Sequence, residues 1–537
     1  MTSNPLPTRL INVENDNRPF VEVTSAQTKG PYAALSYVWG NGKRVMTTKS
    51  NYDAHRKCLS IEGLPLTIAD AVHATRALGY KYLWVDGLCI IQDNKDDLDR
   101  ELPKMGDIYR YAQLTICAQS AESSHAGLFV NRDSRLYRPC KIPITITSDD
   151  GPRKRDVTLA TTWTGPDYLN NRGWVLQERV LSSRCLMFGQ QMAWSCTMGH
   201  AQETRPVLQL KPALPQSSTR WIPERLRQAL YSTPAATGAS RSSSRHASHF
   251  NIWYTMLEEY GDRELTFVAD NIPALSGIAA MFRQAYGTTY LAGLWKEDLS
   301  FGLAWYVALN DRRPVCDDIR GPSWSWASVG KVRIKFRSWR RTSDTLPDAG
   351  ADVLDVDYDT SGMKNPYGFV SKGTISLCAL LQKAVLEYAP DFATTRGKTS
   401  YGKASPGFGG VDAKEQPRYP ALLLHHGTYQ PMAEAALDRP FDSVSGAGAL
   451  MSGPAANSVA RVDVWCVLLH VQRDRDKYHG TLLILKRSKA NPSLFSRLGL
   501  GFLGNEYTDW FGTHNENEER AGSAVTKGLA KRTVHIV

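Results

Sequence analysis

The stretch from Tyr82 to Ala118 constrains the fold more than any other part of this 537-residue chain. Residues 82–91 form an almost unbroken apolar and aromatic run, which is typical of a strand covered on both faces of a parallel sheet. Apolar residues then recur at helical spacing from Leu98 to Ala112, and residues 114–118 return to strand character. The order strand, helix, strand is the building unit of a parallel α/β sheet.

Two acidic residues interrupt this pattern and are the first candidates for a catalytic site. Asp86 lies inside the apolar run, and Glu101 lies on the apolar stripe of the helix. Because burying an unpaired charge is costly, each acid either has an arginine or backbone partner or faces a pocket. Pro103 disfavours helix at the residue before it, so we expect the regular helix to begin at Pro103. Glu101 would then lie at the positive end of the helix dipole.

The first 120 residues predict a small doubly wound α/β sheet. Short strands are expected at 9–13 and 20–23, followed by a strand over 32–41. Residues 67–78 form an amphipathic helix, in which Thr67 is the expected cap and Asp70 completes the capping box. In such sheets ligands bind beyond the carboxyl ends of the strands. The candidate binding residues at this edge are Ser36, Trp39, Gly40, Gln92 and Asp93.

A second polar group follows between residues 170 and 189. Trp174, Gln177 and Glu178 share a helical face, and Arg172 or Arg179 would neutralise a buried acid of the central unit. Gln177 and Glu178 either brace the sheet or reach the pocket. Hairpins are expected at 141–147 with 156–160, and at 184–188 with 192–196.

The rest of the chain predicts two further parts. Residues 233–249 are rich in Ser, Ala and Arg, which is typical of a flexible connector, and a helical region follows over 250–285. Trp324 and Trp326 would project to one face of a strand, and later segments at 374–380, 462–471 and 481–485 are strand-like. We therefore expect an α/β part at 1–200, a linker and helical part at 201–320, and a mainly β part at 321–537.

Composition narrows the class of protein. The formal charge of +11 is spread along the chain, and its densest basic stretch, 331–341, alternates as a strand with one solvated cationic face. No nucleic-acid module accompanies it, so nucleic-acid binding is not favoured. The nine Cys never occur in C-x-x-C spacing and the His residues show no metal spacing, which indicates reduced thiols and no metal site. Without a signal peptide or a run of membrane-spanning length, a cytoplasmic protein away from membranes is expected.

Three blocks of this sequence carry a family resemblance. They are Y-x-A-L-S-Y-V-W-G at 32–40, L-W-V-D-x-L-C-I-x-Q-D at 83–93 followed by E-x-x-x-M-x-x-I-Y-x-x-A at 101–112, and R-G-W-x-L-Q-E at 172–178. In this order and spacing they resemble the heterokaryon-incompatibility (HET) domain of filamentous fungi. The chain departs from the family pattern at Leu98, where relatives place Trp, and at Pro103.

The resemblance implies a role in fungal non-self recognition, in which incompatible partners trigger growth arrest and cell death through protein contacts or self-association. The HET domain is also distantly similar to TIR domains, flavodoxin-like sheets of which several cleave NAD with a helix-borne glutamate. By that analogy NAD would be a substrate and Glu101 would stabilise a ribosyl cation. Asp86 or Asp93 would hold ribose hydroxyls, and Trp39 or Trp84 would stack on a ring.

Three functions remain open at this point. The first is a sensor or effector of incompatibility, the second is a TIR-like nucleotide hydrolase, and the third is an enzyme or accessory protein of fungal secondary metabolism. Buried aromatic residues more often form core than ligand platforms, so Trp39, Trp84 and Trp174 also have a structural interpretation.

Overall fold

The computed structural model describes most of the chain, in two compact units. The described residues are 5–15, 18–25, 27–42, 44–133, 135, 138–148, 151–159, 165–209, 222–232, 243–308, 321–336, 348–358, 360, 363, 365–368, 370–388, 419–426, 431–439, 460–474, 477–503 and 530–537. Unit 1 comprises residues 1–237, 263–265 and 274–285, and unit 2 comprises 238–262, 266–273 and 286–537. The division into parts at residues 200 and 320 stays a prediction, because compactness alone does not show which parts fold independently.

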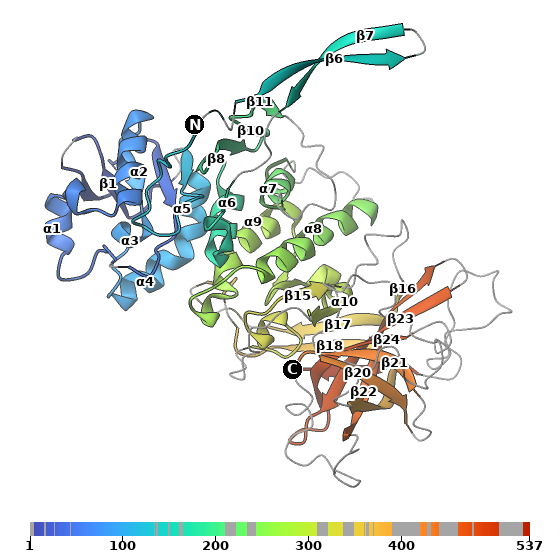
Figure 1. The fold of residues 1–537 in the computed structure, drawn as a ribbon. Coiled ribbons are helices and arrows are strands. Elements are labelled where there is room, and N and C mark those ends of the chain that lie inside the picture. The colour runs from blue at the N-terminus through green and yellow to red at the C-terminus, as the bar shows by residue number, and fades with distance from the viewer. Residues whose placement is uncertain are drawn as a thin grey trace. The chain divides into compact units, whose positions relative to one another are not determined.

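Unit 1 is a mixed α/β structure built on one nine-stranded sheet (Figure 1). The strand order is β11-β10-β9-β8-β5-β3-β4-β1-β2, and the four central strands β8, β5, β3 and β4 are parallel. The remaining strands add to both sides in antiparallel pairs. Their bounds are β1 Arg9–Asn12, β2 Phe20–Val23, β3 Tyr32–Ser36, β4 Tyr82–Trp84, β5 Leu114–Cys117, β8 Arg184–Phe188, β9 Met192–Cys196, β10 His200–Gln202 and β11 Arg205–Gln209.

The helices of unit 1 connect these strands. Their bounds are α1 Tyr52–Lys57, α2 Leu66–Ala77, α3 Asp86–Cys89, α4 Lys95–Glu101, α5 Met105–Tyr111, α6 Gly173–Leu181, α7 Ile222–Ser232 and α9 Ser276–Tyr286. All residues of β3, β4 and β5 are buried, because the sheet centre is covered on both faces. The strand, helix, strand order of residues 82–118 is therefore confirmed.

Two local predictions in this region are wrong. The strand expected over 82–91 ends at Trp84, and Asp86 begins the short helix α3 instead of lying in the strand. The regular helix does not begin at Pro103: α4 ends at Glu101, a 3-10 turn covers Leu102–Lys104, and α5 begins at Met105. Glu101 therefore lies at the carboxyl end of one helix and is not the entrance to a single long one.

The capping box expected on α2 is also absent. Pro65 occupies the cap position, and the Thr67 hydroxyl instead donates to the Ser123 carbonyl (3.1 Å) and accepts from the Gly127 amide (3.0 Å). The Asp70 carboxylate accepts from the Leu128 amide at 2.8 Å. These two side chains hold the 123–128 loop against the helix.

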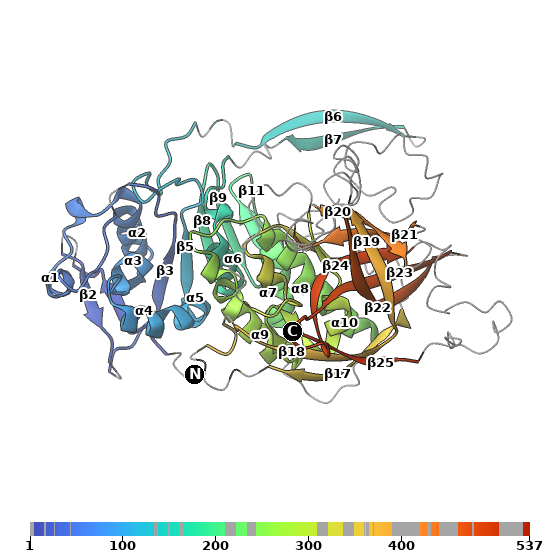
Figure 2. The ribbon, with the colours of Figure 1, turned by 90° about the horizontal axis from the view of Figure 1, so that it is seen from below.

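Both predicted hairpins are confirmed. Strands β8 and β9 pair from Arg184 with Cys196 to Phe188 with Met192. Strands β6 (Cys140–Ser148) and β7 (Gly151–Leu159) form a two-stranded sheet of their own, in which β7 starts earlier than expected. Figure 2 shows them as one long twisted ribbon. The turn residues 149 and 150 and residue 160 lie outside the described part.

Unit 2 contains a closed ring of six antiparallel strands. Each of β22, β19, β20, β21, β24 and β23 pairs with the next, and β23 pairs back onto β22. Alternate aliphatic side chains such as Leu386, Leu423 and Ile484 fill a shared core. Its strands, with the others of this sheet, are β16 Asp348–Ala349, β17 Ala351–Asp357, β18 Thr374–Ala379, β19 Leu381–Tyr388, β20 Tyr419–His425, β21 Pro431–Leu437, β22 Ala460–Asp474, β23 Lys477–Arg487, β24 Leu494–Leu503 and β25 Arg532–Ile536. The strand-like segments predicted at 374–380, 462–471 and 481–485 are confirmed.

Three other predictions for unit 2 need correction. Trp324 and Trp326 are both buried, but they belong to a turn and a 3-10 helix (Trp326–Val329), not to a strand. Helix α8 (Ser243–Gly261) begins within the segment expected to be a flexible connector. In the basic stretch, β15 covers only Ile334–Phe336, and residues 337–341 lie outside the described part. The first lysine, Lys331, is buried with its ammonium 3.5 Å from the Tyr260 ring centre.

The remaining elements of unit 2 are short. They are β12 Tyr290–Leu291, β13 Leu294–Trp295, α10 Leu299–Gly302 and β14 Trp305–Val307. No described helix in either unit combines the length and the apolar character that crossing a bilayer requires.

Candidate functional site

The short helix α3 places Asp86 just beyond the carboxyl end of β4. Its Oδ1 accepts from the Gly87 amide (2.6 Å), its Oδ2 accepts from the Trp39 indole Nε1 (2.9 Å), and the Tyr37 hydroxyl also hydrogen-bonds with this carboxyl group. A Cβ at position 87 would lie 3.0 Å from the Tyr37 hydroxyl, so glycine keeps the approach open. Asp86 remains half-buried as a residue, although its carboxyl group is enclosed by these donors.

Glu178 lies within α6, and its carboxyl group reaches the end of β3. Its Oε2 accepts from the Ser36 hydroxyl at the end of β3, and the Tyr109 hydroxyl of α5, which donates to the Leu35 carbonyl (3.0 Å), lies beside it. The Glu178 side chain is buried. Three elements of unit 1, β3, α5 and α6, therefore meet at this one carboxyl group.

Arg172 serves both acids. It is the N-cap residue of α6, is half-buried, and donates from Nη1 to the Tyr37 carbonyl. Its positive charge lowers the pKa of Asp86 and that of Glu178. These electrostatic effects favour Arg172 over Arg179 as the arginine that balances a buried acid, and Arg179 donates to the Asn170 side chain at 3.2 Å.

At both acids the effect of burial on the pKa is nevertheless larger than the opposing effect of Arg172. Burial is the largest effect on Asp86 and raises its pKa above the usual range. Burial also raises the pKa of Glu178 to about 7, and the neighbouring Asp86 charge acts in the same direction. A carboxyl group with a pKa near neutrality can hold or release a proton at physiological pH. We call Ser36, Tyr37, Trp39, Asp86, Tyr109, Arg172 and Glu178 the acid network.

The other predicted catalytic residue, Glu101, does not join the acid network. Its Oε1 accepts from the Thr8 hydroxyl (2.9 Å), from Arg100 Nε (3.0 Å) and from Lys104 Nζ (3.2 Å). No hydrogen bond or ion pair among the described residues connects it with Asp86. The predicted convergence of Asp86 and Glu101 stays a prediction, and the hydrogen bonds of Glu101 join it to the start of the chain and to neighbouring residues.

A second buried acid explains why α4 lies where it does. The Asp97 carboxylate accepts from the Ile91 amide (2.8 Å) and pairs with the buried Arg9 of β1 and with Arg100. Together with Glu101 it fixes α4 to the first strand. These two acids therefore have a structural explanation that requires no ligand.

The predicted aromatic candidates differ in their access to solvent. Trp39 is half-buried, stacks with Tyr37 (ring centres 6.5 Å apart) and lies under the Arg44 guanidinium at 5.3 Å. Trp84 is fully buried and packs edge-on against Tyr109, so it belongs to the core. Trp174 is half-buried against the same core cluster.

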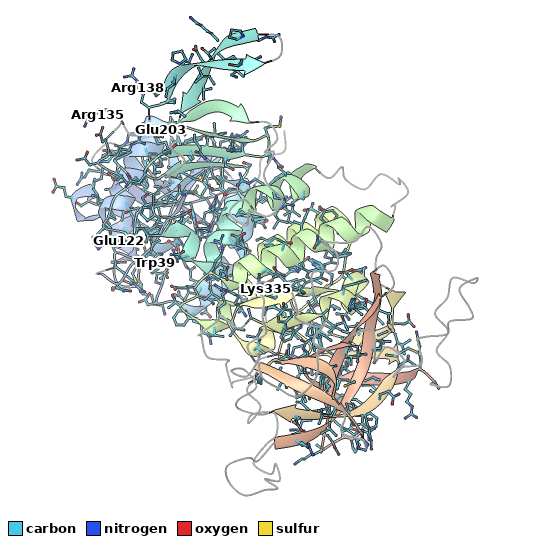
Figure 3. The ribbon with its side chains drawn as sticks, turned by 45° about the vertical axis from the view of Figure 1, so that its right-hand side comes forward. Trp39, Glu122, Arg135, Arg138, Glu203 and Lys335 are labelled. Carbon is cyan, nitrogen blue, oxygen red and sulfur yellow. The ribbon has the colours of Figure 1, made fainter. Side chains whose placement is uncertain are left out.

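The remaining candidates stabilise loops around the acid network. Gly40 has φ +73°, and a Cβ there would lie 2.4 Å from the Ser123 Cβ. Figure 3 shows Trp39 close to Glu122 at this end of the sheet, and the Ser124 amide donates to the Trp39 carbonyl. The Gln92 amide donates to the Asp86 carbonyl at 3.0 Å.

Asp93 and Gln177 lie outside the acid network. Asp93 is exposed and accepts from the Lys49 amide at 2.8 Å. Gln177 is buried and accepts from the Gly277 amide at 2.6 Å, which ties α6 to α9.

Tyr37 and Tyr109 were not singled out from the sequence. Tyr37 lies inside the predicted strand over 32–41, and Tyr109 lies on the predicted apolar stripe, where a phenol hydroxyl is a polar group in need of a partner. That need was the available signal. Burial raises the pKa of both phenols well above 10, so they act as neutral donors.

The acid network surrounds the end of β3, where the direction of chain progression across the sheet reverses. From β3 the chain adds β4 on one side and later β5 on the other. Ligands of open α/β sheets bind at the carboxyl ends of strands at such a point. The described residues contain no group of three or more His, Cys, Asp or Glu arranged as metal ligands. The site thus offers two carboxyl groups, one guanidinium and one partly exposed indole.

A protein-family model matches part of the chain. Residues 32–178 match the family model described as heterokaryon incompatibility protein (HET). Neither a curated protein nor a solved structure matches the chain. All seven residues of the acid network fall inside the matched range.

Proposed function

We propose that this protein acts in fungal non-self recognition, in which contact between incompatible partners triggers growth arrest and cell death inside the cell. The match of residues 32–178 to the heterokaryon incompatibility family carries this proposal. A supporting observation is that polar residues from all three resemblance blocks meet in the acid network. Asp86 comes from the second block, and it shares Arg172 of the third block with Glu178.

Expression of the full chain in a filamentous fungus tests this proposal. We expect induced expression to arrest hyphal growth and to increase uptake of a vital dye. Asp86→Asn keeps the size of the side chain but removes its charge from the site, so it should reduce the effect. Asp107→Asn, an exposed change on α5, is the matched control and should leave the effect intact. A host that grows normally with the wild-type chain at equal protein level would refute the proposal.

A second candidate function is hydrolysis of NAD at its nicotinamide–ribose bond, in the TIR-like manner. The observation in its favour is the pair of acids with raised pKa values beside one arginine at the end of β3. In this mechanism the carbon–nitrogen bond breaks and its electron pair leaves with neutral nicotinamide. An ionised Asp86 would stabilise the ribosyl cation, and Glu178 would accept the proton of the water that forms the new carbon–oxygen bond.

The full chain incubated with NAD distinguishes the two candidates. The hydrolase proposal expects release of nicotinamide, its loss in Asp86→Asn, and its retention in Glu101→Gln, since Glu101 lies outside the acid network. Loss in Glu101→Gln without unfolding would restore the role first assigned to that residue. Growth arrest in a host whose NAD content stays constant would support non-self recognition and reject hydrolysis.

A further inference from the structure

The hairpin of β6 and β7 exposes side chains that globular proteins normally bury. Ile142, Ile146, Val157 and Leu159 are 39%, 45%, 37% and 54% exposed. All other described side chains of the two strands are exposed or half-buried. A two-stranded hairpin is at best marginally stable in water without a partner surface. This ribbon therefore has the composition of a surface that another molecule covers.

The strand register sorts the exposed residues onto two faces. Directly paired residues lie on the same face, and the face alternates along each strand. The pairs Cys140–Leu159, Ile142–Val157, Ile144–Arg155 and Ile146–Arg153 therefore share one face. The opposite face carries Lys141 with Thr158, Pro143 with Asp156, and Thr145 with Lys154. We call the first set the isoleucine face.

The isoleucine face has an apolar end and a cationic end. The apolar end lies farthest from the hairpin turn and consists of Cys140, Ile142, Val157 and Leu159. Nearer the turn, Ile144 pairs with Arg155 and Ile146 pairs with Arg153. The two strands together carry four basic residues and one acid, Asp156. The strand edges add a second means of binding, because β6 and β7 form a sheet of only two strands with backbone groups at both margins.

We propose that the isoleucine face docks an extended segment of a partner protein whose side chains toward this face, every second residue, are aliphatic in one half and acidic in the other. The aliphatic side chains would cover Ile142 and Val157, and the carboxylates would pair with Arg153 and Arg155. A second copy of the hairpin fits less well, because its own Arg153 and Arg155 would repel these arginines. A bilayer fits less well because the described strands contain no Trp or Tyr, the residues enriched at membrane interfaces. This surface is independent of the acid network and of the proposed function.

A labelled synthetic peptide tests the docking surface: every second residue is valine in one half and glutamate in the other half, with serine at the positions between them. Fluorescence anisotropy of this peptide with the full chain should show saturable binding that weakens with salt. Arg153→Glu with Arg155→Glu should weaken binding by about tenfold or more, because carboxylates then meet like charges. Lys141→Glu with Lys154→Glu makes the same change in net charge on the opposite face, and should weaken binding by less than about threefold.

Further measurements complete the test. Ile142→Thr with Val157→Thr keeps every charge and should also reduce binding, while the thermal unfolding midpoint confirms that the chain remains folded. Equal losses in the two charge-reversal variants would overturn the proposal, because long-range attraction alone would then explain binding. Binding to phosphatidylserine vesicles without binding to the peptide would overturn it in favour of a membrane. A dimer in sedimentation that only the isoleucine-face variants dissociate, without peptide binding, would assign the face to a second copy.

Discussion

Ser36, the last residue of β3, donates its hydroxyl to the carboxyl of Glu178, which lies 142 positions further along the chain in α6. This contact joins the first and the last block of the segment that matches the heterokaryon incompatibility family. Because Arg172 lies at the start of the same helix, placing Glu178 also places the guanidinium that serves Asp86. Helix α6 therefore positions both an acid and the arginine of the acid network.

Glu178 should make the stability of the protein fall as the pH rises. Its pKa is raised from 4.5 to about 7 in the folded state, so between these values the unfolded chain releases a proton that the folded chain keeps. Stability is therefore greatest below the lower value, falls through this range, and levels off above it. The loss is on the order of 3 kcal/mol. Glu178→Gln should remove this contribution, which urea unfolding at pH 5 and pH 8 would measure.

Glu62→Gln provides the control for that experiment, because Glu62 is exposed. It should keep the wild-type pH dependence. If Glu178→Gln also retained the full decrease in unfolding free energy between pH 5 and pH 8, Glu178 would not be the titrating group.

Removal of Arg172 should destabilise the domain most strongly at high pH. Arg172→Met leaves two enclosed carboxyl groups without their shared cation, so we expect a loss of about 3 kcal/mol, increasing as the acids ionise. Arg184→Met removes an exposed arginine of β8 and should cost less than about 1 kcal/mol. Unfolding free energies of the two variants at pH 6 and pH 8 test this, and equal losses for both would contradict the assigned role.

Asp97 should matter more for folding than its exposed neighbour. Asp97→Asn leaves the buried Arg9 without its charged partner, so a loss of about 3 kcal/mol is expected. Asp96→Asn changes the same residue type one position earlier, where the side chain is exposed, and should stay within about 0.5 kcal/mol. Urea unfolding measures both. A near-neutral Asp97→Asn would show that α4 is held by its other contacts.

The contact between α5 and α9 should tolerate no additional methyl group. A Cβ on Gly106 would lie 2.9 Å from the Gly277 Cα, and one on Gly277 would lie 2.8 Å from the Gly106 Cα. Gly106→Ala and Gly277→Ala should each cost about 1–3 kcal/mol through overpacking. Gly63→Ala, where the nearest atom to an added Cβ is 3.9 Å away, is the control. Thermal unfolding that ranks Gly63→Ala as the most damaging would contradict this contact.

Local patterns predicted much of the fold. The hairpins β6–β7 and β8–β9 follow from alternation and turn residues that lie within a few positions of each other. The boundary after Trp84 could not be located, because an apolar run is compatible with a buried strand or a buried helical turn. The role of Thr67 was missed because its partner Gly127 lies 60 positions away. The closed ring of unit 2 depends on similarly distant strand pairs.

The site was predicted in part for the same reason. Asp86 and Arg172 were identified because a charge in an apolar segment requires a partner. Glu101 satisfied the same criterion, yet its partners Thr8 and Lys104 supply a structural explanation that only tertiary contacts reveal. For Glu178 the sequence left two roles open, a structural contact with the sheet or a place in a binding pocket. Its hydrogen bond with Ser36 could not be predicted from spacing along the chain, because the two residues are distant in sequence.

Helix α9 enters unit 1 only after the chain has passed through part of unit 2, and its Gly277 amide binds Gln177 of α6. The short segment 263–265 also returns to unit 1. The Glu264 amide donates to the Asn171 carbonyl, and the Gly173 amide donates to the Glu264 carbonyl. Truncation of the chain at any point between residues 180 and 273 would therefore separate helix α9 from the rest of unit 1. A polypeptide limited to residues 32–178 would lack helix α9, which packs against α5 and α6, so we expect truncated variants to misfold.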